Sequence, residues 1–253
     1  MLAHHPLATP ALSQRLILWR FKIVIMRTID ASQGIRILDS RTTASLLSKV
    51  LWITTAGFLF TAFGAYIAPD VLPGAGFFAV VLINFGLIFG IRAATRRSTG
   101  LGLALFYAFT VLMGVEIGPL LKAYLHMAGG QTIVFEAALT TAMGMAVMAM
   151  IAQIARFDYR KLASFAFAAL IGLVIIGFLS AFLHFISPGV YAWLGLVIFS
   201  VLLLVDFMRL RDSPAGTTPV MLALSIYLDA LNIFIFLLQI FGNGGGRRDN
   251  RWS

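Results

Sequence analysis

The sequence predicts an all-α polytopic membrane protein with seven transmembrane helices. Hydrophobic residues make up 60% of the 253 residues and charged residues only 11%, against about 25% charged residues in ordinary soluble domains. Several apolar runs exceed the roughly 18 residues that a helix needs to cross the hydrocarbon of a bilayer. These runs do not alternate apolar and polar residues in segments of about 10, as the strands of a membrane barrel would.

Seven apolar segments separated by short connections define the expected helices. They are Leu47–Ala68, Ala75–Ile91, Leu101–Leu121, Thr132–Ala155, Leu162–Phe185, Val190–Leu210 and Pro219–Phe241. Because the connections are short, neighbouring helices are expected to be antiparallel. The transmembrane domain therefore covers residues 47–241, after an N-terminal arm (1–46) and before a flexible, glycine-rich C-terminal tail (242–253).

The N-terminal arm contains a short apolar stretch, residues 16–26, that Arg20 and Lys22 interrupt. No small-residue cleavage site follows this stretch, which argues against a secretory signal peptide. Two interpretations stay open. The stretch is an interfacial helix of the arm, or the native chain starts at Met26 rather than at Met1.

Lysine and arginine residues gather on alternate sides of the expected spans. The arm and the second, fourth and sixth connections carry several each, whereas the first, third and fifth carry only Lys122 between them. Because basic connections stay in the cytoplasm, the N-terminus is expected there and the C-terminus outside. The basic tail, with Arg247, Arg248 and Arg251, disagrees with this exit, so a seventh segment that re-enters the membrane is the alternative.

The chain lacks residues that several function classes need. It has no cysteine, which excludes disulfides and thiolate metal sites. It has no H-E-x-x-H, G-x-S-x-G or glycine-rich phosphate-binding motif, so neither an enzymatic activity nor a cofactor is expected. Ser180 and His184 are four residues apart, but one such pair is more often a packing feature. The net charge of +9 is spread over short loops, so nucleic acid is not an expected partner.

Four acidic residues lie within the expected spans, where an ionisable side chain is costly unless it faces protein or water. They are Glu116, Glu136, Asp206 and Asp229. At a rise of about 1.5 Å per residue, the glutamates fall in the outer half and the aspartates toward the middle and the inner end. Carboxylates bind calcium and relay protons, so these acids outline a cation or proton pathway. The alternatives are an ion pair of Asp206 with Arg209 and a water-facing Glu116.

The last segment carries a polar stripe. Ser225, Asp229, Asn232 and Gln239 recur at i, i+4, i+7 and i+14 and so share one face of a helix. Asp229 has no basic residue within one helical turn, which favours a functional role. If Asp206 meets Asp229, the two carboxyl groups share one proton and titrate as a unit, which makes the pair a pH switch.

Two further expectations concern the second and fourth segments. Arg96 or Arg97, at the inner end of the second segment, is a candidate to compete for the aspartate carboxylates. Gly86, Gly90 and Gly144 have the four-residue spacing to neighbours that lets helices approach closely, so tight helix packing is expected at these glycines.

Three stretches resemble the Bax inhibitor-1 family, the transmembrane Bax inhibitor motif proteins. The most specific is A-L-S-I-Y-L-D-A-L-N-I-F-I-F-L-L-Q-I-F-G at residues 223–242, and the second is F-S-V-L-L-L-V-D-F-M-R-L at residues 199–210. The third consists of I-R-A-A-T-R-R before L-F-Y-A-F, followed by G-V-E-I-G-P at residues 114–119. The resemblance covers residues 47–242.

The resemblance implies six helices around a central seventh and a pH-sensitive calcium leak gated by a di-aspartyl pair. That pair corresponds to Asp206 and Asp229, which would also be the transient calcium ligands. The arginine partner corresponds best to Arg96, with Arg92 and Arg97 as alternatives. Glu116 is the acid on the third helix. The pathway residues expected here are Glu116, Glu136, Ser225 and Asn232.

The same resemblance implies a multi-pass protein of the bacterial inner membrane, with lipids, calcium and protons as partners. Some bacterial members resemble regulators of a membrane-embedded ATP-dependent protease. The rival hypothesis is therefore a non-conducting scaffold that modulates such a protease or another channel. The sequence does not determine the oligomeric state.

Overall fold

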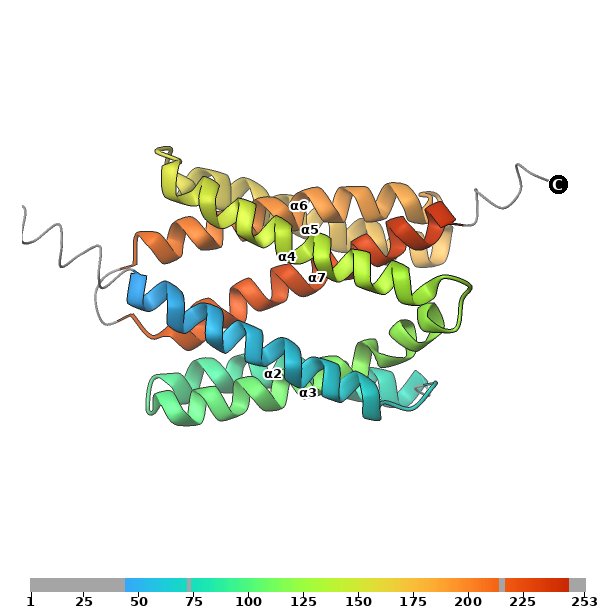
Figure 1. Ribbon diagram of the computed structural model, residues 1–253, viewed down its shortest axis with the longest axis horizontal. Coiled ribbons are helices and arrows are strands. Elements are labelled where there is room, and N and C mark those ends of the chain that lie inside the picture. Colours follow the sequence, from blue (N-terminus) through green and yellow to red (C-terminus); the bar gives the residue numbers. More distant parts are fainter. Residues whose placement is uncertain (1–43, 72–73, 214–216, 246–253) are drawn as a thin grey trace, which may run out of the picture. The chain divides into compact units, whose positions relative to one another are not determined.

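The computed structural model describes residues 44–71, 74–213 and 217–245, and these contain seven helices and no strand (Figure 1). Their bounds are Ala44–Ile67 for the first helix, then α2 Gly74–Thr95, α3 Thr99–Leu125, α4 Gly130–Ile154, α5 Tyr159–Leu183, α6 Pro188–Arg211 and α7 Pro219–Gly245. All seven are long and apolar enough to cross a membrane, which confirms the predicted fold class. The apolar stretch at 16–26, the start at Met26 and the basic tail lie outside the described residues.

Side-chain caps fix where several helices begin. Ser98, Asp158 and Ser187 precede α3, α5 and α6 with extended backbones, and each side chain accepts a hydrogen bond from a backbone N–H of the first turn. Such caps satisfy donors that the helix itself leaves unpaired. Pro188 occupies the first turn of α6, where its missing N–H costs nothing.

Helix α7 extends four residues beyond its predicted end at Phe241, so Gly242–Gly245 belong to the helix and not to a flexible tail. Glycine weakens a helix by about 1 kcal/mol per residue, but here packing favours it. A Cβ atom on Gly242 would lie 2.3 Å from Cε1 of Tyr124 in α3. The missing side chain thus allows the end of α7 to lie directly against the tyrosine ring.

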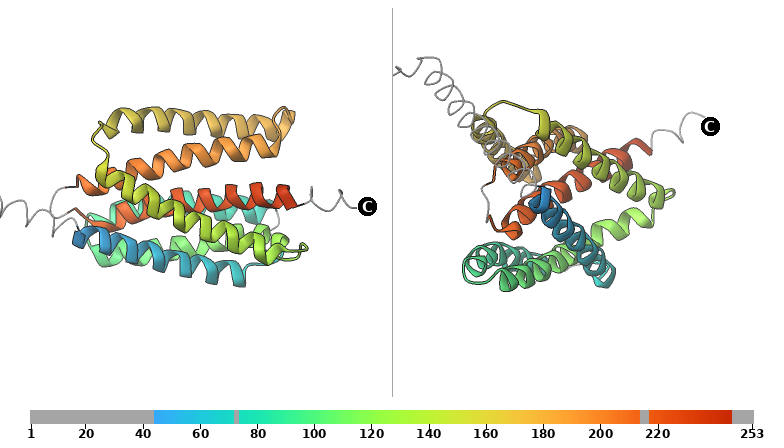
Figure 2. Two further views of the ribbon diagram at one scale, coloured as in Figure 1. Left: turned by 45° about the horizontal axis from the view of Figure 1, so that its top comes forward. Right: turned by 60° about the vertical axis from the view of Figure 1, so that its left-hand side comes forward.

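Helix α7 is the central helix of the described bundle. In its most apolar 18-residue window 67% of the residues are buried, whereas no other helix exceeds 39%. It packs against α2, α3, α4 and α6, and α5 packs against α6 (Figures 1 and 2). One apolar cluster joins α7 to α6 through residues such as Leu203 and Phe236. A second joins α7 to α2 and α3 around Tyr227.

The first helix and α3 approach each other closely, and they do so at glycines other than the predicted ones. A Cβ atom on Gly64 would lie 2.1 Å from the carbonyl oxygen of Val111, and one on Gly114 would lie 2.1 Å from that of Thr61. The prediction of tight packing at Gly86, Gly90 and Gly144 is wrong. A Cβ atom on Gly86 or Gly144 would meet nothing within 4 Å, and one on Gly90 only a leucine methyl at 3.9 Å.

Candidate functional site: a buried aspartate pair between α6 and α7

The two aspartates singled out from the sequence meet between α6 and α7. Asp206 lies five residues before the end of α6, and Asp229 lies in the middle of α7. Their side chains are buried, with exposed fractions of 7% and 8%. The two carboxyl groups lie close enough to interact, and the Ser225 hydroxyl, one turn before Asp229, lies beside Asp206.

A proton between the two carboxyl groups would stabilise this contact. An ionised carboxylate accepts hydrogen bonds but donates none, so two ionised groups in contact repel each other and leave oxygens unpaired. The Asp206 Oδ2 atom is buried and has no hydrogen-bond donor among the described residues. One proton shared by the pair supplies a donor and removes one negative charge. Two carboxyl groups placed in this way can share a proton.

Positive charge near the pair comes from α6 itself. The exposed Arg209 acts on Asp206 electrostatically, but no ion pair joins them within the described residues. Arg96 follows the end of α2 and is exposed. Neither Arg96 nor its alternatives, Arg92 and Arg97, forms an ion pair with any residue that the structure describes. The structure thus does not bring the expected arginine partner to the aspartates.

The polar side chains of the α7 stripe lie in different surroundings along the helix. Ser225 and Asp229 form the aspartate site, whereas the Asn232 side chain donates to the carbonyl oxygen of Leu228 on its own helix at 2.8 Å. Gln239, ten residues beyond Asp229, lies in a cavity next to α5 and α6. The stripe therefore runs along the helix with a break between Asn232 and Gln239, and only its first part contacts the pair.

Glu116 has a partner that the sequence reasoning missed. Asn84 of α2 is 4% exposed, and its Nδ2 donates to Glu116 Oε2 at 2.8 Å across the α2–α3 interface. The Asn84 Oδ1 atom is buried without a partner among the described residues. The one available signal was an asparagine inside an otherwise apolar span, where polar side chains are costly. The hydrogen bond thus places the side-chain amide of Asn84 beside the carboxylate of Glu116.

Glu136 does not join Glu116. It is exposed on α4, and no hydrogen bond or ion pair to it occurs among the described residues. Nor do three or more His, Asp or Glu side chains gather anywhere in the described part of the chain in a way that could hold a metal ion. The carboxyl groups of Asp206 and Asp229 alone provide few of the six to eight oxygen ligands that calcium takes, so any calcium contact at this pair is a weak one.

Comparisons with known proteins agree with the motifs. The family model described as inhibitor of apoptosis-promoting Bax1 matches residues 43–246. An uncharacterized membrane protein of Streptococcus pyogenes serotype M1 is 30% identical over 177 residues, which cover 66% of this chain and 74% of that protein. An uncharacterized protein of Pseudomonas aeruginosa is 26% identical over 212 residues, which cover 82% of this chain and 93% of that protein.

Proposed function

The chain belongs to the Bax inhibitor-1 family, and from that membership we propose that it is a passive, pH-sensitive pathway for calcium across a membrane. The observation that carries the proposal is the buried contact between Asp206 and Asp229 on two packed helices. Buried acids inside a membrane protein that face each other rather than lipid are typical of ion and proton pathways.

In the proposed mechanism the shared proton holds α6 and α7 together. Loss of that proton leaves two negative charges in contact, and their repulsion at short range amounts to about a few kcal/mol at an effective dielectric constant near 20. A free-energy change of that size is sufficient to shift a two-state equilibrium substantially. Calcium then replaces the proton between the carboxylates and moves on, because two ligands do not retain it.

The other polar groups of the spans form the proposed route. Glu116 with Asn84, the exposed Glu136, and Ser225 and Asn232 on α7 offer oxygen atoms to a cation. The proposal includes an inner-membrane location with the N-terminus in the cytoplasm, as the distribution of basic residues favours. It includes neither an enzymatic activity nor a cofactor. Lipids, calcium and protons are the proposed partners.

The test is calcium efflux from vesicles that contain only the purified protein. The wild type is expected to leak calcium with a rate that depends on pH, and Asp206→Asn and Asp229→Asn are expected to flatten that dependence. Asp158→Asn is the matched control, because it also removes a carboxylate while asparagine caps α5 as well as aspartate does. Equal rates and equal pH profiles in the two aspartate variants and the wild type would contradict the gate.

A wild type that leaks no calcium at any pH would favour the rival, a non-conducting scaffold. In that case the aspartates are structural hydrogen-bonding groups, and removing either one lowers stability without affecting flux. Co-purification with a membrane-embedded ATP-dependent protease would then be the next measurement.

A further inference from the structure

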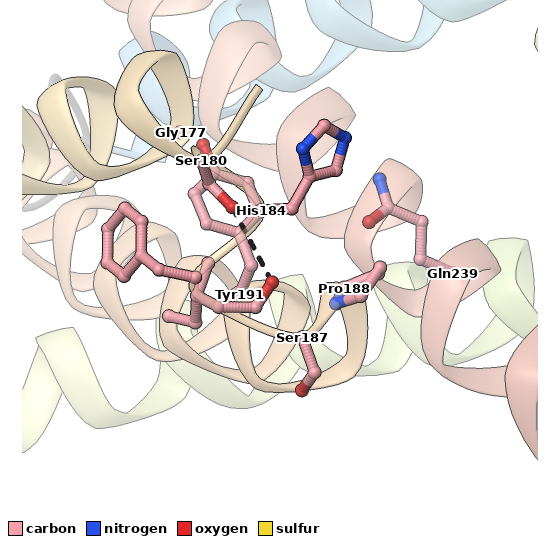
Figure 3. A pocket seen from close by; sticks show the side chains of 9 residues that line it. Gly177, Ser180, His184, Ser187, Pro188, Tyr191 and Gln239 are labelled. Atoms are coloured by element: carbon pink, nitrogen blue, oxygen red, sulfur yellow. Dashed lines mark hydrogen bonds between the residues drawn. The ribbon is translucent and has the colours of Figure 1, made fainter. Parts of the chain in front are cut away.

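A cavity of about 630 Å³, lined by both apolar and polar side chains, lies at the end of the α6–α7 pair opposite the aspartates. Asp206 is near the last turn of α6, whereas the cavity is lined by the first residues of that helix, by the end of α5 and by the last turns of α7. The polar side chains around it are Ser180, His184, Ser187, Tyr191 and Gln239 (Figure 3). They offer oxygen and nitrogen atoms suited to water and to a hydrated cation.

The cavity is connected to the aspartates by one face of α7. Gln239 lines the cavity and belongs to the same polar stripe as Asp229 and Asn232. Ten residues separate Gln239 from Asp229, which is about 15 Å along a helix. A polar face thus leads from the buried pair to an open cavity, with a single interruption between Asn232 and Gln239.

That interruption is Phe236. It lies four residues after Asn232 and three before Gln239, on the same face, and is 6% exposed. Its ring is seated on α6 at Gly195, where a Cβ atom would lie 2.2 Å from the phenylalanine Cζ. The rings of Phe199 and Tyr191 flank it, with centroid distances of 5.9 and 6.0 Å. The phenylalanine therefore fills the α6–α7 interface between the two polar sites.

We propose that this cavity is the second mouth of the pathway, at the end of the helix pair away from Asp206. Phe236 is then the hydrophobic barrier between the water that enters the cavity and the two aspartates. The role of the cavity and of Phe236 in cation passage rests on the proposed function. A ring in a narrow apolar constriction excludes water and, with it, hydrated ions. Gly195 makes the barrier possible because only a residue without a side chain lets the ring reach the α6 backbone.

The chain has no cysteine, so single cysteines report water access to each side of the barrier. Gln239→Cys and Asn232→Cys are to be treated in vesicles with a charged, membrane-impermeant methanethiosulfonate. We expect Gln239→Cys to react, and Asn232→Cys to stay unmodified over the same time. Adding Phe236→Ala should make Asn232→Cys reactive. Phe236→Leu, which keeps most of the apolar volume and is the safer variant for folding, should do so to a smaller extent.

The matched control is Leu238→Ala combined with Asn232→Cys. Leu238 is on the same helix, 1% exposed and outside the stripe, so its removal loosens packing without opening the proposed route. Modification of Asn232→Cys at equal rates with and without Phe236, or equal gains from Phe236→Ala and Leu238→Ala, would overturn the barrier.

Calcium efflux separates this inference from the proposed function. If Phe236→Ala makes Asn232→Cys reactive but the protein leaks no calcium, the mouth and the barrier are supported and calcium is not the permeant ion. Efflux that depends on the aspartates but not on Phe236, together with unchanged labelling, would keep the gate and refute the second mouth.

Discussion

The hydroxyl groups of Thr61 and Tyr227 lie 2.6 Å apart and join the first helix to α7. Thr61 Oγ1 also donates toward the carbonyl oxygens of Gly57, at 3.0 Å, and of Thr110 in α3, at 3.1 Å. Because Thr61 has one hydroxyl proton and faces two carbonyl oxygens, Tyr227 is the donor of the shared hydrogen bond. Two residues before Asp229, a fully buried tyrosine thus ties the central helix to two of its neighbours.

Removing the tyrosine hydroxyl is expected to destabilise the bundle. Tyr227→Phe keeps the ring, which packs edge-on against Phe106 and Phe109, and loses the hydrogen bond, at a cost of about 0.6 to 1.7 kcal/mol in a membrane protein. Unfolding in denaturing detergent measures the cost. Tyr66→Phe, at an 82% exposed tyrosine of the first helix, is the neutral control. Combining Tyr227→Phe with Thr61→Ala should cost less than the sum of both.

The close crossing of the first helix and α3 predicts that replacing glycine by alanine lowers stability at one position and not at another. Gly114→Ala places a methyl group against the Thr61 carbonyl oxygen, and because backbone cannot move as a side chain does, we expect a loss of about 1 to 3 kcal/mol or more. Gly144→Ala, whose methyl group meets nothing within 4 Å, should be neutral or slightly stabilising. Thermal unfolding of both variants in one detergent measures this. Similar melting temperatures would contradict the close approach.

Arg211 connects the end of α6 to the end of α4. Its Nη1 donates to the carbonyl oxygens of Ala152 and, at 2.7 Å, of Ala155, while Nε and Nη2 bind Asp212 at 2.7 and 3.0 Å. A lysine keeps the charge but lacks the planar fork of donors. Arg211→Lys should therefore cost about 1.5 kcal/mol and speed hydrogen exchange at the end of α4. Arg97→Lys, at an exposed arginine without an ion pair in the described structure, should change neither.

Asp70, in the connection after the first helix, forms a pH-dependent ion pair with Lys122 of α3. Lys122 Nζ lies 3.0 Å from Asp70 Oδ1 and donates to the carbonyl oxygen of Ala68 at 2.5 Å. The hydrogen bond and the charge of Lys122 lower the pKa of Asp70 below its usual value. The pair therefore stabilises the folded state fully above the usual aspartate pKa of about 3.9, and this contribution is lost as the pH falls through the lower folded pKa.

Asp70→Asn should accordingly lower the melting temperature slightly at pH 7 and have no effect at the lowest pH at which the protein stays folded. The effect is small because the Asp70 side chain is 81% exposed, and it should shrink further at high salt. A difference between variant and wild type that grows toward low pH would contradict the assignment.

The position of the aspartates was predictable because two features of the sequence pointed to it. The polar stripe of α7 marks one face of an otherwise apolar helix, and the motifs at 199–210 and 223–242 pair Asp206 with Asp229. Arg96 was suggested only by its place at the end of the second span. Since the connection gives no information on which way its side chain turns, the exposed position of Arg96 could not be foreseen.

The sequence by itself determined that seven segments cross a membrane and that α7 carries the polar face, because hydropathy and helical spacing are local properties. Only the tertiary structure decided the partners: Asn84 with Glu116, Gly64 against α3, and Phe236 on Gly195. The physical reason is that most of these helices are apolar on every side. In a bilayer no hydrophobic force distinguishes lipid from a neighbouring helix, so composition does not reveal which face is buried, and shape and hydrogen bonding select the contacts.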